Sequence, residues 1–329
     1  MTPEPWPRPT VGVVGAGGIA APHLEAWRHL GARLLVHSQD GAEAAAARVG
    51  AEVVPSLDAL LEACDLVDVC TPTHTHQDIV LRAAAAGRDV VCEKPLSHRY
   101  EEAVAMIDAC EAAGVQLHPG QVVRYFPEYA TARELVASGR IGAPAVLRLT
   151  RRGARPERSW FADDARSGGI LVDQMIHDFD FARWVAGEVV QVFAAVAGAE
   201  PGPTVATAVL THADGALTHV LGGWGHPHER FRTTFSVAGA TGLLRHASEG
   251  TEGLRLDLPE AGAGGELLPG GSGASVPFVA ELAEFAAARA GGPAPRVSAA
   301  DSLAALEIAL AARRSAEVGE PVRLAGVPA

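Results

Sequence analysis

The sequence predicts an α/β domain with a parallel sheet, followed by an α+β domain with a mainly antiparallel sheet. Three observations support this prediction. Apolar strand-like segments alternate with helical segments over residues 10–118, which indicates right-handed βαβ units. Strand-like segments dominate the second half, where Asp214-Gly215 is typical of a hairpin turn. The length of 329 residues exceeds one small core, so we expect domains at residues 1–121 and 122–329.

Each element of the first domain follows from the spacing of its apolar residues and from the residues that bound it. Ser56 suits the N-cap of one helix, and Gly87 and Gly114 end two others. The predicted strands are residues 10–14, 33–37, 53–54, 66–70, 89–93 and 115–118. The predicted helices are residues 21–29, 42–49, 57–63, 76–86 and 101–113.

The second domain opens with a predicted helix over residues 127–138, and a second helix over residues 170–185 interrupts its strands. Two more helices, over residues 276–290 and 300–318, lie toward the end of the chain. The predicted strands are residues 145–150, 189–197, 205–211, 216–221, 232–237 and 254–258.

The net charge and the cysteine spacing indicate which binding partners and which cellular compartment to expect. The net charge is −12, from 27 basic and 39 acidic residues, and no Lys/Arg cluster offers a face for a nucleic-acid backbone. No stretch has the length of a membrane span or the apolar core of a signal peptide. The four cysteines lack metal-ligand spacing, which favours free thiols in a reducing compartment. We therefore expect a cytoplasmic protein that binds neither nucleic acid nor a membrane.

A glycine-rich turn follows the first predicted strand and opens the first helix, in a G-x-G-x-x-A pattern. The first glycine permits the sharp turn, and the second lets a pyrophosphate approach the backbone. A small last residue lets helix and strand pack closely, and N–H groups at the helix N-terminus face the phosphates. The pattern predicts a dinucleotide-binding Rossmann domain, with cofactor contacts at Gly15, Gly17, Gly18, Ile19 and Ala20.

The residue that distinguishes NAD from NADP is expected at the end of the second strand. A carboxylate there would hold the adenosine ribose hydroxyls of NAD, but this sequence has Ser38. A serine leaves room for the 2′-phosphate of NADP, although Gln39, and not an arginine, follows it. Asp40 could substitute for the carboxylate but comes about one turn too late in the chain. Both NAD and NADP stay open as cofactors, with a slight lean to NADP.

Glu93-Lys94-Pro95 stands at the carboxyl end of a predicted parallel strand, where ligands bind in open α/β sheets. Lysine is so rare in this chain that Lys94 stands out. Its ammonium group could donate a hydrogen bond to a substrate hydroxyl and stabilise alkoxide character as hydride leaves. A surface ion pair at a strand end would give the same pattern. The Lys94–Pro95 bond is also a candidate for the cis form.

A second group of polar residues lies on the predicted helix over residues 170–185. Asp173 and His177 are four residues apart and fall on one helix face, with Asp180 on nearly the same side. A histidine suits a general base that takes an alcohol proton, because its ordinary pKa is close to neutrality. Asp173 would orient the imidazole or stabilise its charged form. A capping or salt-bridge role on an exposed helix is the alternative.

The order of these motifs resembles the Gfo/Idh/MocA oxidoreductases over nearly the whole chain. The motifs run from the glycine turn through Thr71-Pro72-Thr73 and the Lys94 motif to a G-G-x-x-x-D-x-x-x-H-x-x-D segment that begins at Gly168. The chain is similar to the inositol 2-dehydrogenases and glucose-fructose oxidoreductases of that family. Residues 173–180 look most like the inositol 2-dehydrogenases.

The resemblance implies an α/β Rossmann domain followed by an α+β domain whose mainly antiparallel sheet is open on one face. Such faces are often used for homodimers or homotetramers, and the implied substrates are polyols, sugars and their derivatives. The catalytic positions of the family fall on Lys94, Asp173 and His177. The cofactor positions fall on the third-strand loop, on the Lys94 motif and on a glutamine near the nicotinamide. These residues are Thr71, Pro72, Thr73, His76, Glu93, Lys94 and Gln121.

The expected reaction is the reversible oxidation of a secondary alcohol, with hydride passing to the nicotinamide of NAD or NADP. Two alternatives keep the same residues. One is an enzyme that cleaves a glycoside and recycles its cofactor, and the other is a non-catalytic protein that senses the dinucleotide. Histidines at 226 and 228 have a spacing that could hold a metal, but no acidic or cysteine cluster accompanies them, so we expect no metal site.

Four arginines lie within residues 151–158, between the strand at residues 145–150 and the helix at residues 170–185. They could form an anion-binding lip for the substrate or belong to a solvated loop. These residues are Arg151, Arg152, Arg155 and Arg158.

Overall fold

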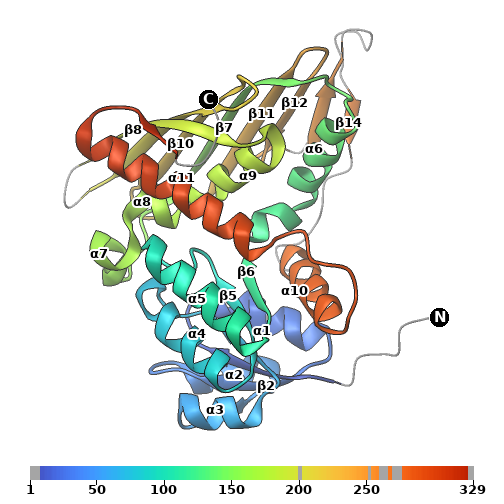
Figure 1. Cartoon of the computed structure of the whole chain (residues 1–329), viewed down its shortest axis with the longest axis vertical. Helices are drawn as coiled ribbons and strands as arrows, with labels where there is room; N and C mark the ends of the chain where they lie inside the picture. The colour runs from blue at the N-terminus through green and yellow to red at the C-terminus, as the bar shows by residue number, and fades with distance from the viewer. Residues whose placement is uncertain (1–7, 199–201, 251–252, 259–265, 269–275, 325–329) are drawn as a thin grey trace. The chain divides into compact units, whose positions relative to one another are not determined.

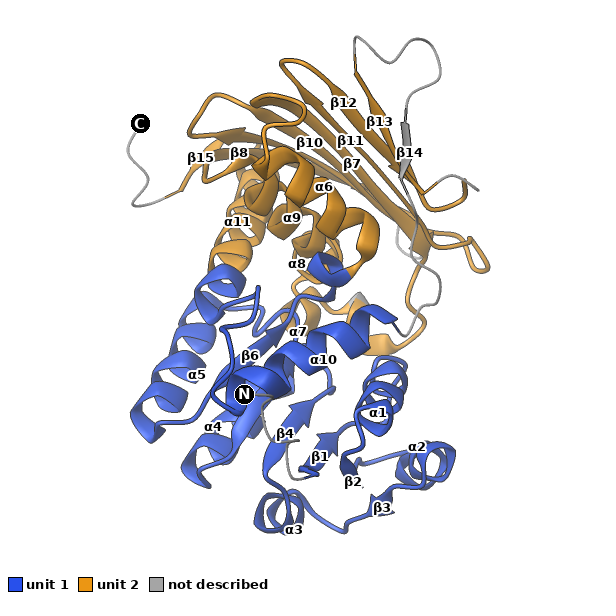
Figure 2. Ribbon diagram, turned by 90° about the vertical axis from the view of Figure 1, so that its right-hand side faces the viewer, with its two compact units in different colours: residues 1–125, 272–303 blue, residues 126–271, 304–329 orange. Residues whose placement is uncertain are grey.

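The structure is a computed structural model that describes residues 8–198, 202–250, 253–258, 266–268 and 276–324 (Figure 1). The chain divides into two compact units, coloured separately in Figure 2. Unit 1 comprises residues 1–125 and 272–303, and unit 2 comprises residues 126–271 and 304–329.

Unit 1 contains a six-stranded parallel sheet in the order β3-β2-β1-β4-β5-β6. Its central strands are buried on both faces, as expected for a parallel sheet covered by helices. The direction in which successive strands are added to the sheet reverses between β1 and β4. The carboxyl ends of β1, β4 and β5 therefore lie next to one another. The strands are β1 (Thr10–Val14), β2 (Arg33–His37), β3 (Glu52–Val53), β4 (Leu66–Val69), β5 (Asp89–Glu93) and β6 (Leu117–Gly120).

The helices of unit 1 agree with the predicted alternation, and one further helix joins them from late in the chain. This helix packs against α1, where the rings of His23 and Phe278 lie 5.3 Å apart. Arg289 also pairs with Asp89 at 2.6 Å. Residues 272–303 therefore belong with unit 1 and not, as predicted from the sequence, with the second domain. The helices are α1 (Ala20–His29), α2 (Ala42–Val49), α3 (Leu57–Ala63), α4 (His76–Ala85), α5 (Tyr100–Ala113) and α10 (Val276–Arg289), with 3₁₀ turns η1 (Thr73–Thr75) and η2 (Val122–Tyr125).

Unit 2 contains a nine-stranded sheet in the order β14-β13-β12-β11-β7-β10-β9-β8-β15. All its pairs are antiparallel except β7 with β10, so the predicted mainly antiparallel α+β domain is confirmed. Two of its strands, β12 and β14, were not predicted from the sequence. The strands are β7 (Pro144–Ala154), β8 (Val189–Gly198), β9 (Thr204–His212), β10 (Leu217–Gly225), β11 (Arg232–Gly239), β12 (Leu243–Ala247), β13 (Leu254–Asp257), β14 (Glu266–Leu268) and β15 (Val322–Arg323).

Helices cover one face of this sheet, and no described helix packs on the other (Figure 2). Phe179 and Phe181 of α9 are fully buried, and the ring of Phe181 lies 5.3 Å from that of Phe235 on β11. Ser315 of α11 accepts a hydrogen bond from the backbone of Ala194 on β8 at 2.9 Å. The helices are α6 (Pro127–Ala137), α7 (Asp164–Ser167), α8 (Gly169–Asp173), α9 (Ile176–Ala186) and α11 (Ala299–Val318), with 3₁₀ turn η3 (Ser159–Ala162).

The predicted helix over residues 170–185 is wrong in one respect, because the chain breaks it into α8 and α9. The amide of Met175 bonds to the carbonyl of Ile170, which interrupts the regular helical ladder. The side chain of Gln174 donates to the carbonyl of Arg151 on β7 at 2.8 Å. Met175 is fully buried against Gly222, where any Cβ would lie 2.6 Å from the methionine side chain. Contacts with the sheet therefore override the local helical pattern.

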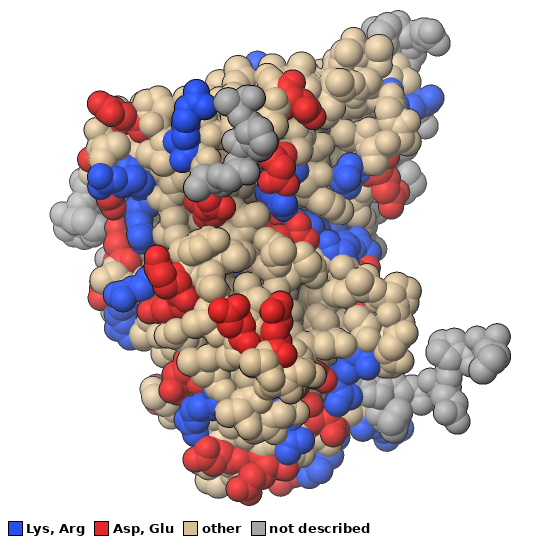
Figure 3. Space-filling model, viewed as in Figure 1, with Lys and Arg blue, Asp and Glu red and all other residues tan. Residues whose placement is uncertain are grey.

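The four cysteines are buried and free, as predicted from their spacing. Burial raises the pKa of the Cys64 thiol to about 11, so this side chain stays neutral at physiological pH. On the face shown in Figure 3, acidic and basic side chains are interspersed with uncharged surface. None of the described helices combines the length and hydropathy needed to cross a membrane.

Candidate functional site

The glycine turn joins β1 to α1 as the sequence pattern predicts. Gly15 has a φ of +106°, and its amide donates to the carbonyl of His37 at 2.8 Å. A Cβ at this position would lie 2.7 Å from the carbonyl oxygen of Cys70, so only glycine fits. Gly18 faces open space, with nothing within 4 Å of its added Cβ. The turn therefore leaves room for a ligand beside the backbone.

The N-terminus of α1 is available to an anion. Ile19 occupies the N-cap without a side-chain hydrogen bond, and the first turn holds no acidic residue. Ala20, the first residue of the helix, is fully buried, as the predicted close packing of helix and strand requires. The first N–H groups of a helix need acceptors, and a pyrophosphate supplies them in a dinucleotide-binding turn. These residues fit the phosphates of a dinucleotide.

The loop after β4 carries the Thr71-Pro72-Thr73 motif. The hydroxyl of Thr75 donates to the Thr71 hydroxyl or the Pro72 carbonyl, at 2.8 Å in each case. His76 lies beneath this loop, 1% exposed, with its ring nitrogens 2.9 Å from the Thr71 carbonyl and 3.0 Å from the Pro95 carbonyl. His76 therefore ties the loop after β4 to the loop after β5. Because both ring nitrogens of His76 already contact backbone carbonyls, this side chain stabilises the conformation of the two loops.

The Glu93-Lys94-Pro95 motif ends β5, on the strand next to β4. Glu93 is buried, whereas Lys94 is partly exposed. The backbone N–H of Lys94 donates to the Glu93 carboxylate at 3.0 Å. The Lys94–Pro95 peptide bond is cis, as proposed from the sequence. Lys94 is also the only lysine in the chain.

Gln121 follows β6 and is completely buried. Its backbone N–H donates to the Pro119 carbonyl at 3.0 Å. Neither polar atom of its side chain has a hydrogen-bond partner among the described residues. An unsatisfied buried amide is costly, and a polar ligand would relieve the cost. The buried amide of Gln121 is thus able to bind a polar ligand, and its place beside a bound cofactor stays a prediction.

Ser38 directly follows β2 and is half-buried, while Gln39 and Asp40 are exposed. The Gly15 amide bonds to the last carbonyl of β2, so Ser38 lies one residue beyond the strand end that the glycine turn contacts. Ser38 therefore lies directly after the end of β2, and its role in distinguishing NAD from NADP stays a prediction.

In unit 2, the predicted catalytic pair lies on either side of the helix break. Asp173 ends α8 and is 8% exposed, and His177 lies in the first turn of α9 and is half-buried. The two residues therefore do not share one continuous helix, contrary to the sequence analysis. Asp180 is 1% exposed, so it belongs to the packed side of α9.

Arg151 and Arg152 lie on β7 and not in a loop, whereas Arg155 and Arg158 lie in the segment that follows this strand. Arg151 is buried, and its guanidinium holds Asp178 of α9 with contacts of 2.9 and 3.1 Å. The side chain of Arg152 is 44% exposed and pairs with Glu229 at 3.2 Å. The buried pair anchors α9 to the sheet beside the helix break.

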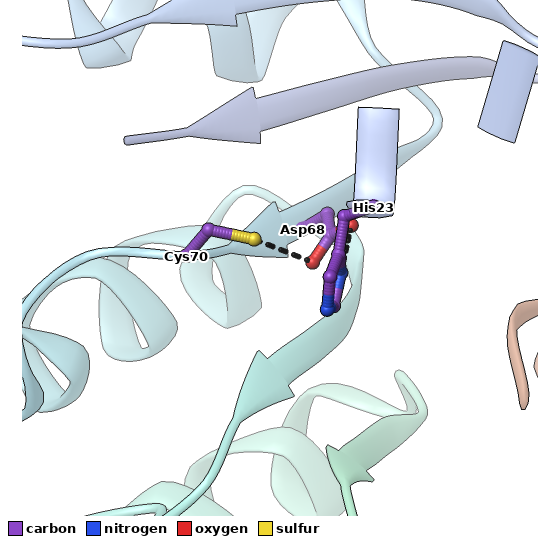
Figure 4. A group of neighbouring side chains, drawn as sticks. All are labelled: His23, Asp68 and Cys70. Atoms are coloured by element: carbon purple, nitrogen blue, oxygen red, sulfur yellow. Dashed lines mark hydrogen bonds and ion pairs between the residues drawn. The ribbon is translucent and has the colours of Figure 1, made fainter. Parts of the chain in front are cut away.

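Sequence reasoning missed a buried polar cluster in unit 1. Among the described residues, His23, Asp68 and Cys70 form a group whose potential ligand atoms all lie within 4.8 Å of one another (Figure 4). The feature of the sequence that could have indicated this cluster is Asp68, a charged residue inside the apolar segment at residues 66–70. The histidines at 226 and 228 do not belong to this group.

Family models match both units of the chain. Residues 10–121 match an oxidoreductase family with an NAD-binding Rossmann fold, and residues 129–245 match the GFO/IDH/MocA C-terminal domain. The chain belongs to the GFO/IDH/MocA oxidoreductase family. The resemblance stated from the motifs is thereby confirmed.

Individual members of the family are similar to this chain over different lengths. Alignments with three curated relatives cover 50%, 54% and 57% of those proteins, so the chain spans about half their length. Inositol 2-dehydrogenase of Rhizobium meliloti is 36% identical over 184 residues, which are 54% of each protein. D-apiose dehydrogenase of Paraburkholderia graminis is 31% identical over 348 residues, covering 96% of this chain and 90% of the relative.

A solved structure extends the similarity to the whole fold. GenD2 from gentamicin A biosynthesis, crystallised in complex with NAD, superposes with a TM-score of 0.84. It is 26% identical, and the superposition covers 96% of each chain.

Proposed function

We propose that this protein is an NAD-dependent dehydrogenase that oxidises a secondary hydroxyl of a polyol, sugar or sugar derivative. The observation that supports the proposal is that three predicted motifs lie together at the carboxyl edge of the unit 1 sheet. The neighbouring strands β1, β4 and β5 end there in the glycine turn, the Thr71 loop and Lys94. Ligands of open α/β sheets bind at such carboxyl ends. The similarity to dehydrogenases of inositol and D-apiose supports a substrate of this class.

The proposed chemistry divides between three side chains. Lys94 donates a hydrogen bond to the hydroxyl oxygen and stabilises the negative charge that develops on it. His177 takes the hydroxyl proton as a general base, and Asp173 orients its imidazole or stabilises its charged form. When bound, the nicotinamide supplies the acceptor for the hydride of the carbinol carbon.

The residues that would hold the dinucleotide belong to unit 1. Gly15, Gly17, Gly18, Ile19 and Ala20 would hold the pyrophosphate at the N-terminus of α1. Thr71, Pro72, Thr73 and Gln121 would line the nicotinamide side, on loops that His76 and Glu93 hold in place. Ser38 would meet the adenosine ribose.

We propose NAD as the preferred cofactor, against the slight lean to NADP from the sequence. Residues 38–41 offer no positive charge for a 2′-phosphate, and Asp40 would repel it. The related GenD2 structure is a complex with NAD.

Cofactor preference can be tested at Ser38. We expect wild-type kcat/KM to be higher with NAD than with NADP. Ser38→Asp should raise this preference by about 10-fold, equivalent to roughly 1.4 kcal/mol of added repulsion, whereas Ser38→Arg should lower it. Ser38→Ala is the uncharged control and should change the ratio little. A wild-type preference for NADP would contradict this assignment.

The reaction itself can be tested with a panel of sugars and polyols, each assayed with NAD and with NADP by the absorbance of the reduced nicotinamide. A dehydrogenase accumulates reduced cofactor in proportion to the oxidised product. Product without reduced cofactor would instead indicate a cofactor-recycling enzyme. Cofactor binding without turnover of any compound would indicate a sensing protein.

We also propose that the protein is a cytoplasmic homodimer or homotetramer that associates through the open face of the unit 2 sheet. Three apolar side chains, one on each of β8, β9 and β10, are substantially exposed. Phe193 is 40% exposed, Val205 39% and Leu217 38%. Large exposed apolar patches are typical of association surfaces. Sedimentation velocity would test the proposal, which predicts no appreciable monomer at micromolar concentration.

A further inference from the structure

A buried network of charged side chains lies behind the Lys94 motif, entirely within unit 1. His23 of α1 places Nδ1 2.8 Å from Asp68 Oδ2 on β4 and Nε2 3.0 Å from Glu93 Oε1 on β5. The indole N–H of Trp27 also donates to Asp68 Oδ2, at 2.7 Å. His23, Asp68 and Trp27 are completely buried, and Glu93 is 4% exposed. Figure 4 shows His23 beside Asp68.

The geometry requires a particular protonation state of His23. Each ring nitrogen faces a carboxylate oxygen, and only the imidazolium form has an N–H donor on both nitrogens. Burial alone would lower the pKa of His23, but the negative charge of Asp68 and its hydrogen bond raise it well above the ordinary value. His23 is therefore a buried cation between two carboxylates.

For two further titratable groups near His23, Cys70 and Glu281, burial favours the neutral form. The Cys70 thiol donates to Asp68 at 3.5 Å, and burial raises the pKa of Cys70 to about 12. Glu281 of α10 is fully buried, and neither of its carboxyl oxygens has a hydrogen-bond partner among the described residues. Burial, followed by the charge of Glu93, raises the pKa of Glu281 well above its ordinary value. Burial and the charge of Glu93 therefore favour the neutral, protonated form of Glu281.

This arrangement does not suit a metal ion. Asp68 Oδ2 already accepts from both His23 and Trp27, and the closest approach of His23 to Asp68 is an ordinary hydrogen bond. A Cys70 thiol that stays protonated up to high pH is also a poor metal ligand. The cluster is a hydrogen-bonded ion network.

The network ends at the backbone of Lys94. One oxygen of Glu93 contacts His23, and the other accepts the N–H of Lys94 at 3.0 Å. Glu93 is thus held from both sides, with its charge balanced by His23.

We propose that His23 is a positioning residue for Lys94: as a buried cation it fixes the Glu93 carboxylate, which in turn fixes the backbone that carries the lysine. The catalytic consequence rests on the function proposed above, whereas the positioning of Lys94 does not. A misplacement of about 1 Å at a reacting group can lower turnover by about 100-fold, so such support has a measurable effect.

The proposal can be tested by amine labelling, because Lys94 is the only lysine and the N-terminal amine is the only other reactive amine. The rate at which acetic anhydride modifies Lys94 is measured by mass spectrometry of its peptide in wild type and in His23→Gln. We expect a several-fold change in this rate. The matched control is His212→Gln in unit 2. His212 is 1% exposed, and its ring nitrogens contact Gly187 and Thr218 at 2.8 Å. This control should leave the Lys94 rate unchanged.

The same variants distinguish positioning from a general loss of stability. With an active substrate, His23→Gln should lower kcat by up to about 100-fold. The KM for the substrate and the KM for the cofactor should change little. The Tm difference from wild type should be largest below about pH 6.5 and shrink at higher pH, because the raised pKa of His23 means that its contribution is lost as the folded protein releases that proton. His212→Gln should show neither the kcat effect nor this pH dependence.

Glu93→Gln removes the negative charge from the His23–Glu93 pair. If His23→Gln does not fold, the labelling rate of Lys94 in Glu93→Gln tests the proposal instead. An unchanged Lys94 labelling rate in the folded variant would overturn the proposal, even in an active enzyme. A changed rate in a protein that oxidises none of the polyols would keep the positioning and refute only the proposed function.

Discussion

Lys94→Ala is expected to lower kcat by about 10²- to 10⁴-fold while leaving the affinity for NADH within a few-fold of wild type. The variant loses the donor that stabilises charge on the substrate oxygen, but it keeps the glycine turn and the N-terminus of α1. Turnover is measured on the best compound of the polyol panel, and NADH binding is measured by fluorescence titration. Lys94→Arg retains a positive charge with a different shape and should fall between wild type and Lys94→Ala.

The single lysine allows a check that needs no mutation. Complete acetylation of amines in the wild-type protein should reproduce the loss of turnover, because Lys94 is the only lysine that can react. Acetylated Lys94→Ala protein is the control for the N-terminal amine and should keep the residual activity of the unmodified variant. Full turnover in Lys94→Ala would remove Lys94 from the reaction.

Asp178→Ala is expected to lower the free energy of unfolding by about 3–5 kcal/mol, because it leaves the buried guanidinium of Arg151 without its partner. The pair joins α9 to β7 by two contacts, and both side chains are at most 6% exposed. The loss is measured by urea denaturation. The matched control is Glu188→Ala, which breaks the contact of 2.7 Å with Arg183, in a pair whose glutamate is 52% exposed.

The control should cost no more than about 1 kcal/mol, since solvent screens exposed pairs. An equal loss in the two variants would show that the Arg151–Asp178 pair does not anchor α9. Replacing both partners, as in Arg151→Met with Asp178→Leu, should recover much of the stability lost in Asp178→Ala, because no unpaired charge then remains buried.

Local patterns predicted the parts of the site that depend on neighbouring residues in the sequence. The turn at Gly15 needs positive φ and a close approach to Cys70, so a glycine there already indicates the geometry. The position of Lys94 at the carboxyl end of β5 was predictable because it directly follows an apolar segment of the sequence. The parallel arrangement of the strands in unit 1 was predictable from the alternation of strands and helices.

Features that depend on distant contacts were not predictable in this way. The partners of His23 lie 45 and 70 residues away in sequence, so no spacing rule connects them. The break between α8 and α9 is caused by the bond from Gln174 to β7 and by the packing of Met175 against Gly222. The return of residues 276–289 to unit 1 likewise depends on packing against α1. In each case tertiary contacts outweigh the local pattern.

The most direct test of the proposed function is the fate of the hydrogen on the carbinol carbon. An active polyol or sugar from the panel is deuterated at that carbon and incubated with the enzyme and NAD, and the nicotinamide is analysed by mass spectrometry and NMR. We predict one deuterium on C4 of the reduced nicotinamide for each oxidised product, and a much slower transfer in Lys94→Ala. Product formed with the deuterium retained or lost to water, and with no reduced nicotinamide, would contradict the assignment as a dehydrogenase.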